Sequence, residues 1–544
     1  MKLRKQDQEF RNPKIFYPDP KNIDLDRVLI NLFLLMKCDG TRPVTRGRPQ
    51  AGYEKVETHR QKLAEMDGVE GFDGELAWVA DQWLKTDVFD MVNRDRPSEA
   101  IASLRPLHLE AHKVCIAKHC RDYNHADALY AMLEHDESRA LIDLREYLDL
   151  GRDPLTRKYN GVTPLDLETL TVLKRVEGID DMHSGSDKVA PHPPTCKGQA
   201  RVLCNDVQRL LAYKDVVPRP VMIDYLKTVL GLHLGLYTFR VGRQLSGWIA
   251  DKKSNATCRE CPVWGTAAEP FAQCPYGMSF TVDMGNDFRS RMAQIAQEDA
   301  AVEYGRLVDL VKAIFAMNQL LRYSKEEKLK PGEDPFEVPS LLAEPPAMFE
   351  ADFKATLKEI ARQNAEEEEL TPEVKAILDA GMPAFDTLVE LITHVRQKHH
   401  MSYLVQMIDK LLQKNTPFGA VAQGFSRTNP RRWHLGGRML EVFAQLAVLH
   451  HHDGKDGEKS FHTEPMLIED FMRWVEHRYG FVIGPATTPE GRRPVTLDEH
   501  RAFRENVRAL KDRLREIGFY DDLSDAYNAQ TVRPRYPLAR KGVA

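Results

Sequence analysis

Residues 220–250, PVMIDYLKTVLGLHLGLYTFRVGRQLSGWIA, indicate the fold most directly. Their apolar side chains recur with helical periodicity, so we expect one long helix over this stretch. The same periodicity dominates the rest of the chain, and a second long helix is expected over residues 289–323. Shorter helices are predicted at 25–37, 75–84, 99–104, 107–120, 126–135, 138–150, 199–213, 438–450, 466–479 and 497–517. The predicted fold class is therefore mostly α, with minor β.

The minor β-structure is expected at two places. Residues 278–284, MSFTVDM, alternate between apolar and polar side chains and run into a Gly-Asn turn, which predicts one strand. Residues 481–496 follow a predicted helix and are typical of two short strands around an exposed tip. Helix, loop, helix and ribbon in this order predict a winged-helix-like C-terminal region.

The pattern divides the chain into five segments. Residues 324–348 contain five prolines and alternating charges, which is typical of an exposed linker. The other segments are an N-terminal helical domain (1–180), a helical domain with a cysteine knuckle (181–323), a helical region (349–435) and the winged-helix-like region (436–544).

Composition indicates a globular cytoplasmic protein. The 544 residues are 42% hydrophobic and 29% charged, and 76 basic against 81 acidic residues give a net charge of −5. This balance excludes a polybasic protein, so any contact with nucleic acid requires a local basic patch. The first residues lack the apolar core of a secretory signal, and no apolar run is long enough to span a bilayer. We therefore expect no membrane contact.

A cysteine knuckle is the clearest candidate for a cofactor site. Cys258 and Cys261 form a C-x2-C pair, and twelve residues separate Cys261 from Cys274. Thiolates at this spacing reach one ion, and tetrahedral zinc then requires a fourth ligand. We take Cys204 as that ligand, with Cys196, His192 and His183 as alternatives. An iron–sulfur cluster fits the same residue types, and the simplest alternative is a set of unconnected reduced cysteines.

A basic patch with one aromatic residue points to nucleic acid. Arg427, Arg431 and Arg432 surround Trp433, and Arg438 follows shortly after. Guanidinium groups suit phosphate, and an indole stacks on a base. Two further arginines at the tip of the predicted ribbon, Arg492 and Arg493, extend the expected DNA-binding surface. The alternative is a protein-docking or purely structural region.

The sequence contains no signature of an enzyme. Phosphate loops, G-x-G-x-x-G, nucleophile elbows and H-E-x-x-H are all missing from the sequence. The remaining hypothesis of a metal-dependent nuclease or other hydrolase rests on Asp283 and Asp287 beside the predicted strand. It rests equally on His108, His112 and His119, which would lie on one face if residues 108–119 formed a helix.

Four sequence blocks stand out together: residues 258–287 (CREC, then CPY running into TVDMGND), 431–438 (RRWHLGGR), 471–480 (FMRWVEHRYG) and 518–536 (GFYDDLSD, then RPRY). Together they resemble accessory proteins of bacterial anti-phage defence clusters, namely the methylation-associated defence system. The resemblance implies a bacterial host and partner proteins from the same operon: a methyltransferase, a specificity subunit and ATPases. It implies no catalytic residue. We therefore expect a non-enzymatic accessory subunit that binds DNA or partner proteins.

Overall fold

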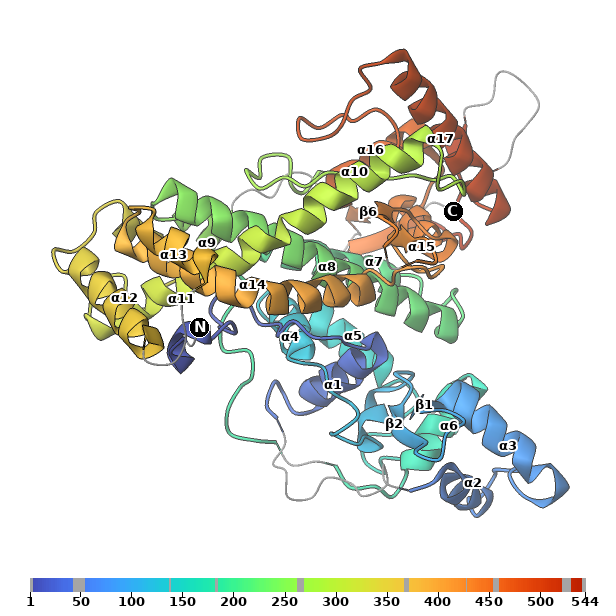
Figure 1. The fold of residues 1–544 in the computed structure, drawn as a ribbon. Helices are drawn as coiled ribbons and strands as arrows, with labels where there is room; N and C mark the ends of the chain where they lie inside the picture. The colour runs from blue at the N-terminus through green and yellow to red at the C-terminus, as the bar shows by residue number, and fades with distance from the viewer. Residues whose placement is uncertain are drawn as a thin grey trace.

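The computed structural model describes residues 3–42, 54–136, 138–181, 184–261, 269–365, 371–426, 428–453, 459–520 and 530–540. The protein is mostly helical, and its strands pair in small two-stranded sheets, which confirms the predicted fold class. Helix α8 (Arg219–Asp251) runs through the middle of the molecule, with α7, α11 and α14 packed against it (Figure 1). Among the described helices, none is both long and apolar enough to cross a membrane.

Two glycines in α8 allow this close packing. A Cβ atom on Gly231 would lie 2.8 Å from the carbonyl oxygen of Leu411, and one on Gly235 would lie 2.7 Å from the side chain of Leu412. A glycine inside a helix costs about 1 kcal/mol relative to alanine. Without side chains at these two positions, the end of α14 packs directly on the backbone of α8, and this contact offsets the cost.

The N-terminal part is built on α1 (Leu25–Lys37), whose bounds match the prediction. The carboxylate of Asp24 accepts the Asp26 N–H at 3.0 Å and caps the helix, and Gly40, at a φ of +78°, lets the chain turn away after its end. The remaining elements are η1 (Lys5–Gln8), α2 (Val56–Ala64), η3 (Gly74–Leu76), α3 (Ala77–Trp83), η4 (Leu84–Val88), β1 (Phe89–Val92), β2 (Ala100–Leu104), η5 (Leu109–Lys113), α4 (His125–Glu134), α5 (Ala140–Leu148) and α6 (Leu167–Val176).

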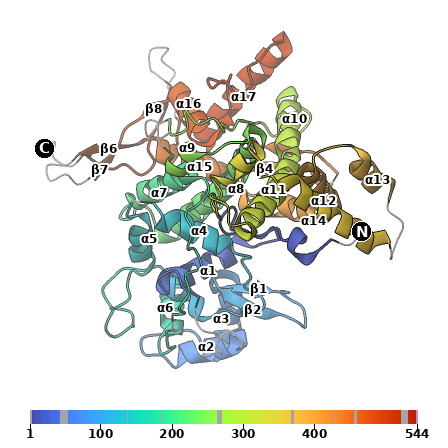
Figure 2. The ribbon, with the colours of Figure 1, turned by 90° about the vertical axis from the view of Figure 1, so that its left-hand side faces the viewer.

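The middle part supplies the helices that surround α8. They lie on both sides of it in the two views of the molecule (Figures 1 and 2). Besides α8, the elements of the middle part are α7 (Lys197–Leu211), α9 (Ala256–Glu260), β3 (Phe280–Thr281), α10 (Arg291–Gly305), α11 (Leu307–Glu326), η6 (Val338–Leu342), α12 (Phe349–Ala365), α13 (Pro372–Asp379) and α14 (Ala384–Leu411).

The C-terminal part is tied to the middle part by strand pairing. Strand β9 pairs in parallel with β3, while β8 pairs with β10 near the end of the chain. The elements here are β4 (Val421–Gln423), β5 (Arg431–Trp433), α15 (Gly437–Ala447), β6 (Leu449–Asp453), β7 (Lys459–Thr463), β8 (Met466–Leu467), α16 (Ile468–Tyr479), β9 (Phe481–Val482), α17 (Leu497–Glu516) and β10 (Thr531–Val532).

Several predicted elements differ from the structure. The helix predicted at 99–104 is replaced by strand β2 (Ala100–Leu104), because a short apolar run fits either form and its pairing with β1 decides. Residues 107–120 form only the short 3-10 helix η5 and turns. The long helix predicted at 289–323 is broken after Gly305 into α10 and α11. The strand expected after the knuckle is present, but only as the two residues of β3.

The predicted exposed linker and the predicted ribbon of the winged-helix-like region also differ from the structure. Within residues 324–348, Phe336, Val338 and Leu341 are buried, so this connector is not exposed throughout. The two-stranded ribbon expected over 481–496 does not form, since β9 pairs with β3 and the rest is a loop in which the Ala486 N–H donates to the carbonyl of Arg492. The hairpin of this region is β6–β7, which precedes α16.

A buried carboxylate joins the middle and C-terminal parts. Asp206 of α7 is fully buried and accepts hydrogen bonds from Arg478 Nε at 2.9 Å and from the Tyr479 hydroxyl at 2.8 Å. The imidazole Nε2 of His233 in α8 lies 2.9 Å from the same carboxylate, and Gln199 Nε2 lies 2.7 Å from the other ring nitrogen. We call these five residues the Asp206 cluster. Burial alone would raise the pKa of Asp206, but Arg478 and His233 hold it below its usual range.

Replacing Arg478 tests how much the fold depends on this cluster. We expect Arg478→Met to lower the free energy of unfolding by about 3–5 kcal/mol, because it leaves a buried carboxylate without its cation. Arg473→Met on the same helix is the control, since Arg473 pairs with Asp470 in an exposed position worth at most about 1 kcal/mol. Chemical denaturation measures both, and equal effects of the two substitutions would contradict the role of the cluster.

Candidate functional site

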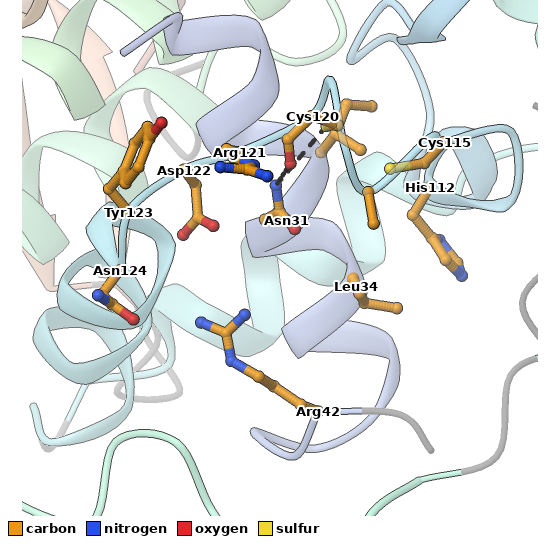
Figure 3. Close-up of a pocket in the computed structure, with 12 residues that line it drawn as sticks. Asn31, Leu34, Arg42, His112, Cys115, Cys120, Arg121, Asp122, Tyr123 and Asn124 are labelled. Atoms are coloured by element: carbon orange, nitrogen blue, oxygen red, sulfur yellow. Dashed lines mark hydrogen bonds between the residues drawn. The ribbon is translucent and has the colours of Figure 1, made fainter. Parts of the chain in front are cut away.

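A pocket of about 240 Å³ opens beside α1 in the N-terminal part. Figure 3 shows Arg42 extending toward the carboxylate of Asp122, and Asn31 donating to the carbonyl of Cys120, at 3.0 Å. The chain that leads into α4 forms the other wall, and Tyr123 and Asn124 there adopt positive φ angles of 50° and 65°. The lining residues are Ile30, Asn31, Leu34, Arg42, His112, Cys115, Ala117, Cys120, Arg121, Asp122, Tyr123 and Asn124.

The charge of this pocket is largely balanced within the protein. The Arg42 guanidinium lies 2.6 Å from the buried carboxylate of Asp127, and Arg11 lies 3.9 Å from its other oxygen. Burial raises the pKa of Asp127 to about 6. The positive charge of Arg42 opposes this rise in the pKa, and the negative charge of Asp122 adds to it. The pocket therefore offers polar groups to a small ligand, but its best-placed cation is already paired.

The side chains on which the hydrolase hypothesis rests make ion pairs and hydrogen bonds within the protein. The buried Asp283 carboxylate is paired with Arg432, and Asp287 accepts the backbone N–H of Arg289 at 2.9 Å. His108 caps η5 by accepting the Glu110 N–H at 3.1 Å, and the ring of His112 bonds to the Leu109 carbonyl. In the part of the chain that the structure describes, no group of three or more His, Cys, Asp or Glu side chains is arranged to hold a metal ion.

The predicted metal ligands separate into one group and one outlier. Cys258 and Cys261 lie in and directly after α9, and Cys274 approaches the guanidinium of Arg240 at 3.8 Å. Cys204 lies elsewhere: its thiol donates to the Met132 carbonyl at 3.4 Å, at the contact of α7 with α4. The structure does not bring Cys204 to the other three cysteines. Among the alternatives, Cys196 lies near them, and His183 falls outside the described residues.

The arginines expected to bind DNA make ion pairs inside the protein. Arg431 forms two 2.8 Å bonds to the carboxylate of Asp409, and the buried Arg432 is paired with Asp283. Trp433 is 1% exposed and packs against Phe280, Phe239 and Tyr304, so its ring faces no solvent. Sequence spacing gave no sign of these partners, because they lie far away along the chain.

The remaining arginines of the expected surface are also engaged. Arg438 lies 2.7 Å from Glu441, and Arg492 lies 3.0 Å from Glu298 and 2.8 Å from Glu499. Arg493 donates to the Ala486 carbonyl at 3.3 Å. Arg427 lies outside the described residues. DNA binding by this set stays a prediction, and any such contact must compete with these internal bonds.

Comparison with known families identifies the chain. Residues 5–536 match the family described as methylation-associated defense system protein MAD7. The chain belongs to the MAD7 family. This match confirms the resemblance drawn from the four sequence blocks and makes the chain part of a defence system, with partner proteins implied. No curated protein and no solved structure matches the chain.

The raised pKa of Asp127 predicts a pH effect on stability. A pKa of about 6, against an ordinary value near 3.9, corresponds to about 3 kcal/mol. Because the folded protein holds this proton more tightly than the unfolded chain, lowering the pH from 7 to 4 stabilises the wild type relative to Asp127→Asn by about 2 kcal/mol. The full difference is not reached because the unfolded carboxylate is itself about half protonated at pH 4. Denaturation at several pH values measures the difference.

A control of opposite sign is available on an exposed turn. Hydrogen bonds from Thr156 lower the pKa of Asp153, so the same comparison with Asp153→Asn runs in the other direction as the pH falls. A difference between wild type and Asp127→Asn that stays flat from pH 7 to pH 4 would contradict the raised pKa.

Proposed function

We propose that the chain is a non-enzymatic accessory subunit of its defence system and binds a partner protein of the same system in the cytoplasm. The observation that carries this proposal is an apolar surface on η3 and α3. Leu76 is 65% exposed, Trp78 67% and Val79 42%. Large apolar side chains grouped in this way favour a protein interface, because an isolated soluble chain gains nothing by exposing them.

Exposed acidic residues directly precede this apolar group along the chain. Residues 66–83 contain five carboxylates and no lysine or arginine. Asp67, Glu70, Asp73 and Glu75 are exposed. We call these four, together with Leu76, Trp78 and Val79, the α3 surface. Charge complementarity selects a partner with a basic surface around an apolar recess.

The α3 surface stands on a rigid support. Arg60 of α2 lies 2.9 Å from the carboxylate of Asp81 and donates to the Phe72 carbonyl at 2.6 Å. The rings of Phe72 and Trp83 pack edge to face. Both views place α2 and α3 at the outer edge of the N-terminal part (Figures 1 and 2). A partner would therefore meet a preorganised surface, which lowers the entropy cost of binding.

A protein partner is favoured over duplex DNA. The acidic α3 surface repels phosphate, and Arg432, Arg492 and Arg493 are bonded to carboxylates or carbonyls within the protein. Contact with DNA through those arginines would require internal ion pairs to break. DNA binding is therefore the second outcome of the test below.

We expect Trp78→Ser to weaken binding to a co-encoded partner at least 30-fold, because loss of a central aromatic anchor costs about 2 kcal/mol or more. Pull-down of purified partner proteins of the same system, followed by a titration of the one retained, measures the effect. Leu155→Ser is the control, since Leu155 is 92% exposed and lies outside the α3 surface. Asp73→Lys should weaken the same complex and reduce its dependence on salt.

A parallel DNA titration separates the two partners. Wild type and Arg492→Ala/Arg493→Ala should bind a duplex equally weakly at two salt concentrations. A loss of affinity in the double variant, with a salt slope smaller by about two, would favour DNA as the ligand. Partner binding that is unchanged by Trp78→Ser would contradict the proposed interface.

A further inference from the structure

Four cysteines from three distant segments meet beside the first turn of α7. Cys196 immediately precedes this helix and is buried. A Cβ atom on Gly198, in the same turn, would lie 3.2 Å from the sulfur of Cys261, so that sulfur reaches the helix backbone. The guanidinium of Arg240 bonds to Gln199 in this turn, at 3.2 Å, and also lies against the sulfur of Cys274. Cys258 belongs to α9, whose C-cap is Cys261. The four thiols therefore form one group.

One face of α8 presents N–H donors to this group. Arg240, Gln244 and Trp248 are spaced by four residues and so lie on the same side of the helix. The Arg240 guanidinium lies 3.8 Å from the sulfur of Cys274. The side chains of Trp248 and Gln244 face the sulfur of Cys258. N–H donors around thiolate sulfur are typical of metal–thiolate sites.

An unsatisfied polar group points to the same place. Trp248 is fully buried, and its indole N–H has no acceptor at hydrogen-bonding geometry among the described residues. A buried donor without a partner costs about 1–3 kcal/mol. A negatively charged Cys258 thiolate would supply the missing acceptor, and a bound cation would keep that thiol deprotonated.

We propose that Cys196, Cys258, Cys261 and Cys274 bind one zinc ion, with the N–H donors of α8 holding the thiolates in place. Four thiolates match the tetrahedral preference of structural zinc. The start of a fifteen-residue helix at Cys196 adds a favourable dipole for thiolate. Since no three candidate ligands among the described residues already form a coordination shell, binding must draw the four sulfurs together. The site replaces Cys204 by Cys196 as the fourth ligand.

Metal content tests the proposal with a matched pair of substitutions. Wild-type protein purified under reducing conditions should contain about one zinc per chain, measured by elemental analysis. Cys204→Ser should keep the metal, whereas Cys196→Ser should lose most of it. Both cysteines are buried and belong to the same helix or its cap, so general destabilisation alone would affect the two variants alike.

Cobalt substitution counts the sulfur ligands without relying on a serine variant. Cobalt bound to four thiolates shows intense ligand-to-metal charge-transfer and d–d bands, and Cys196→His should retain metal with weaker thiolate bands. Wild type free of zinc and silent with cobalt would overturn the proposal, as would metal loss in Cys204→Ser with retention in Cys196→Ser. Iron with inorganic sulfide in the purified protein would also overturn it and assign a cluster instead.

Discussion

The fold depends on keeping one carboxylate charged in the middle of the protein. Asp206 has no access to water, so its charge is tolerated only because Arg478, Tyr479 and His233 surround it. These partners come from α16 and α8, while Asp206 belongs to α7. The three helices must therefore meet in one relative position. A purely apolar contact would allow several relative positions of these helices, because apolar surfaces pack without fixed direction.

The same polar network continues toward the cysteine group. His233 contacts Gln199, whose side-chain oxygen accepts from Arg240 at 3.2 Å, and Arg240 reaches Cys274. The proposed zinc site and the Asp206 cluster thus share the side chains between α7 and α8. A metal at the cysteines would fix the segment after α8 on the same two helices that hold the C-terminal part. With the proposed metal bound, the Asp206 cluster and the zinc site would together hold the long helical chain in a single arrangement.

The sequence predicted local structure well and distant partners poorly. Periodicity placed α1 at residues 25–37 and the long α8 within about a residue at each end, since both patterns are local. It missed β2, whose form depends on pairing with β1. The cysteine spacing indicated three of the proposed ligands, but choosing Cys196 over Cys204 requires knowing which side of α7 faces α9. The internal partner of the basic patch could not be read from local sequence for the same reason: Asp283 lies 149 positions from Arg432.

We propose that this MAD7-family chain acts through the α3 surface at the edge of its N-terminal part. Hydrogen–deuterium exchange of the full-length chain, alone and mixed in turn with each purified partner protein and with duplex DNA, tests it most directly. We predict that one partner protein slows exchange in residues 66–83 and leaves residues 431–438 and 486–496 unchanged. Protection by DNA at residues 431–438 and 486–496, with residues 66–83 unchanged by every partner, would contradict the account.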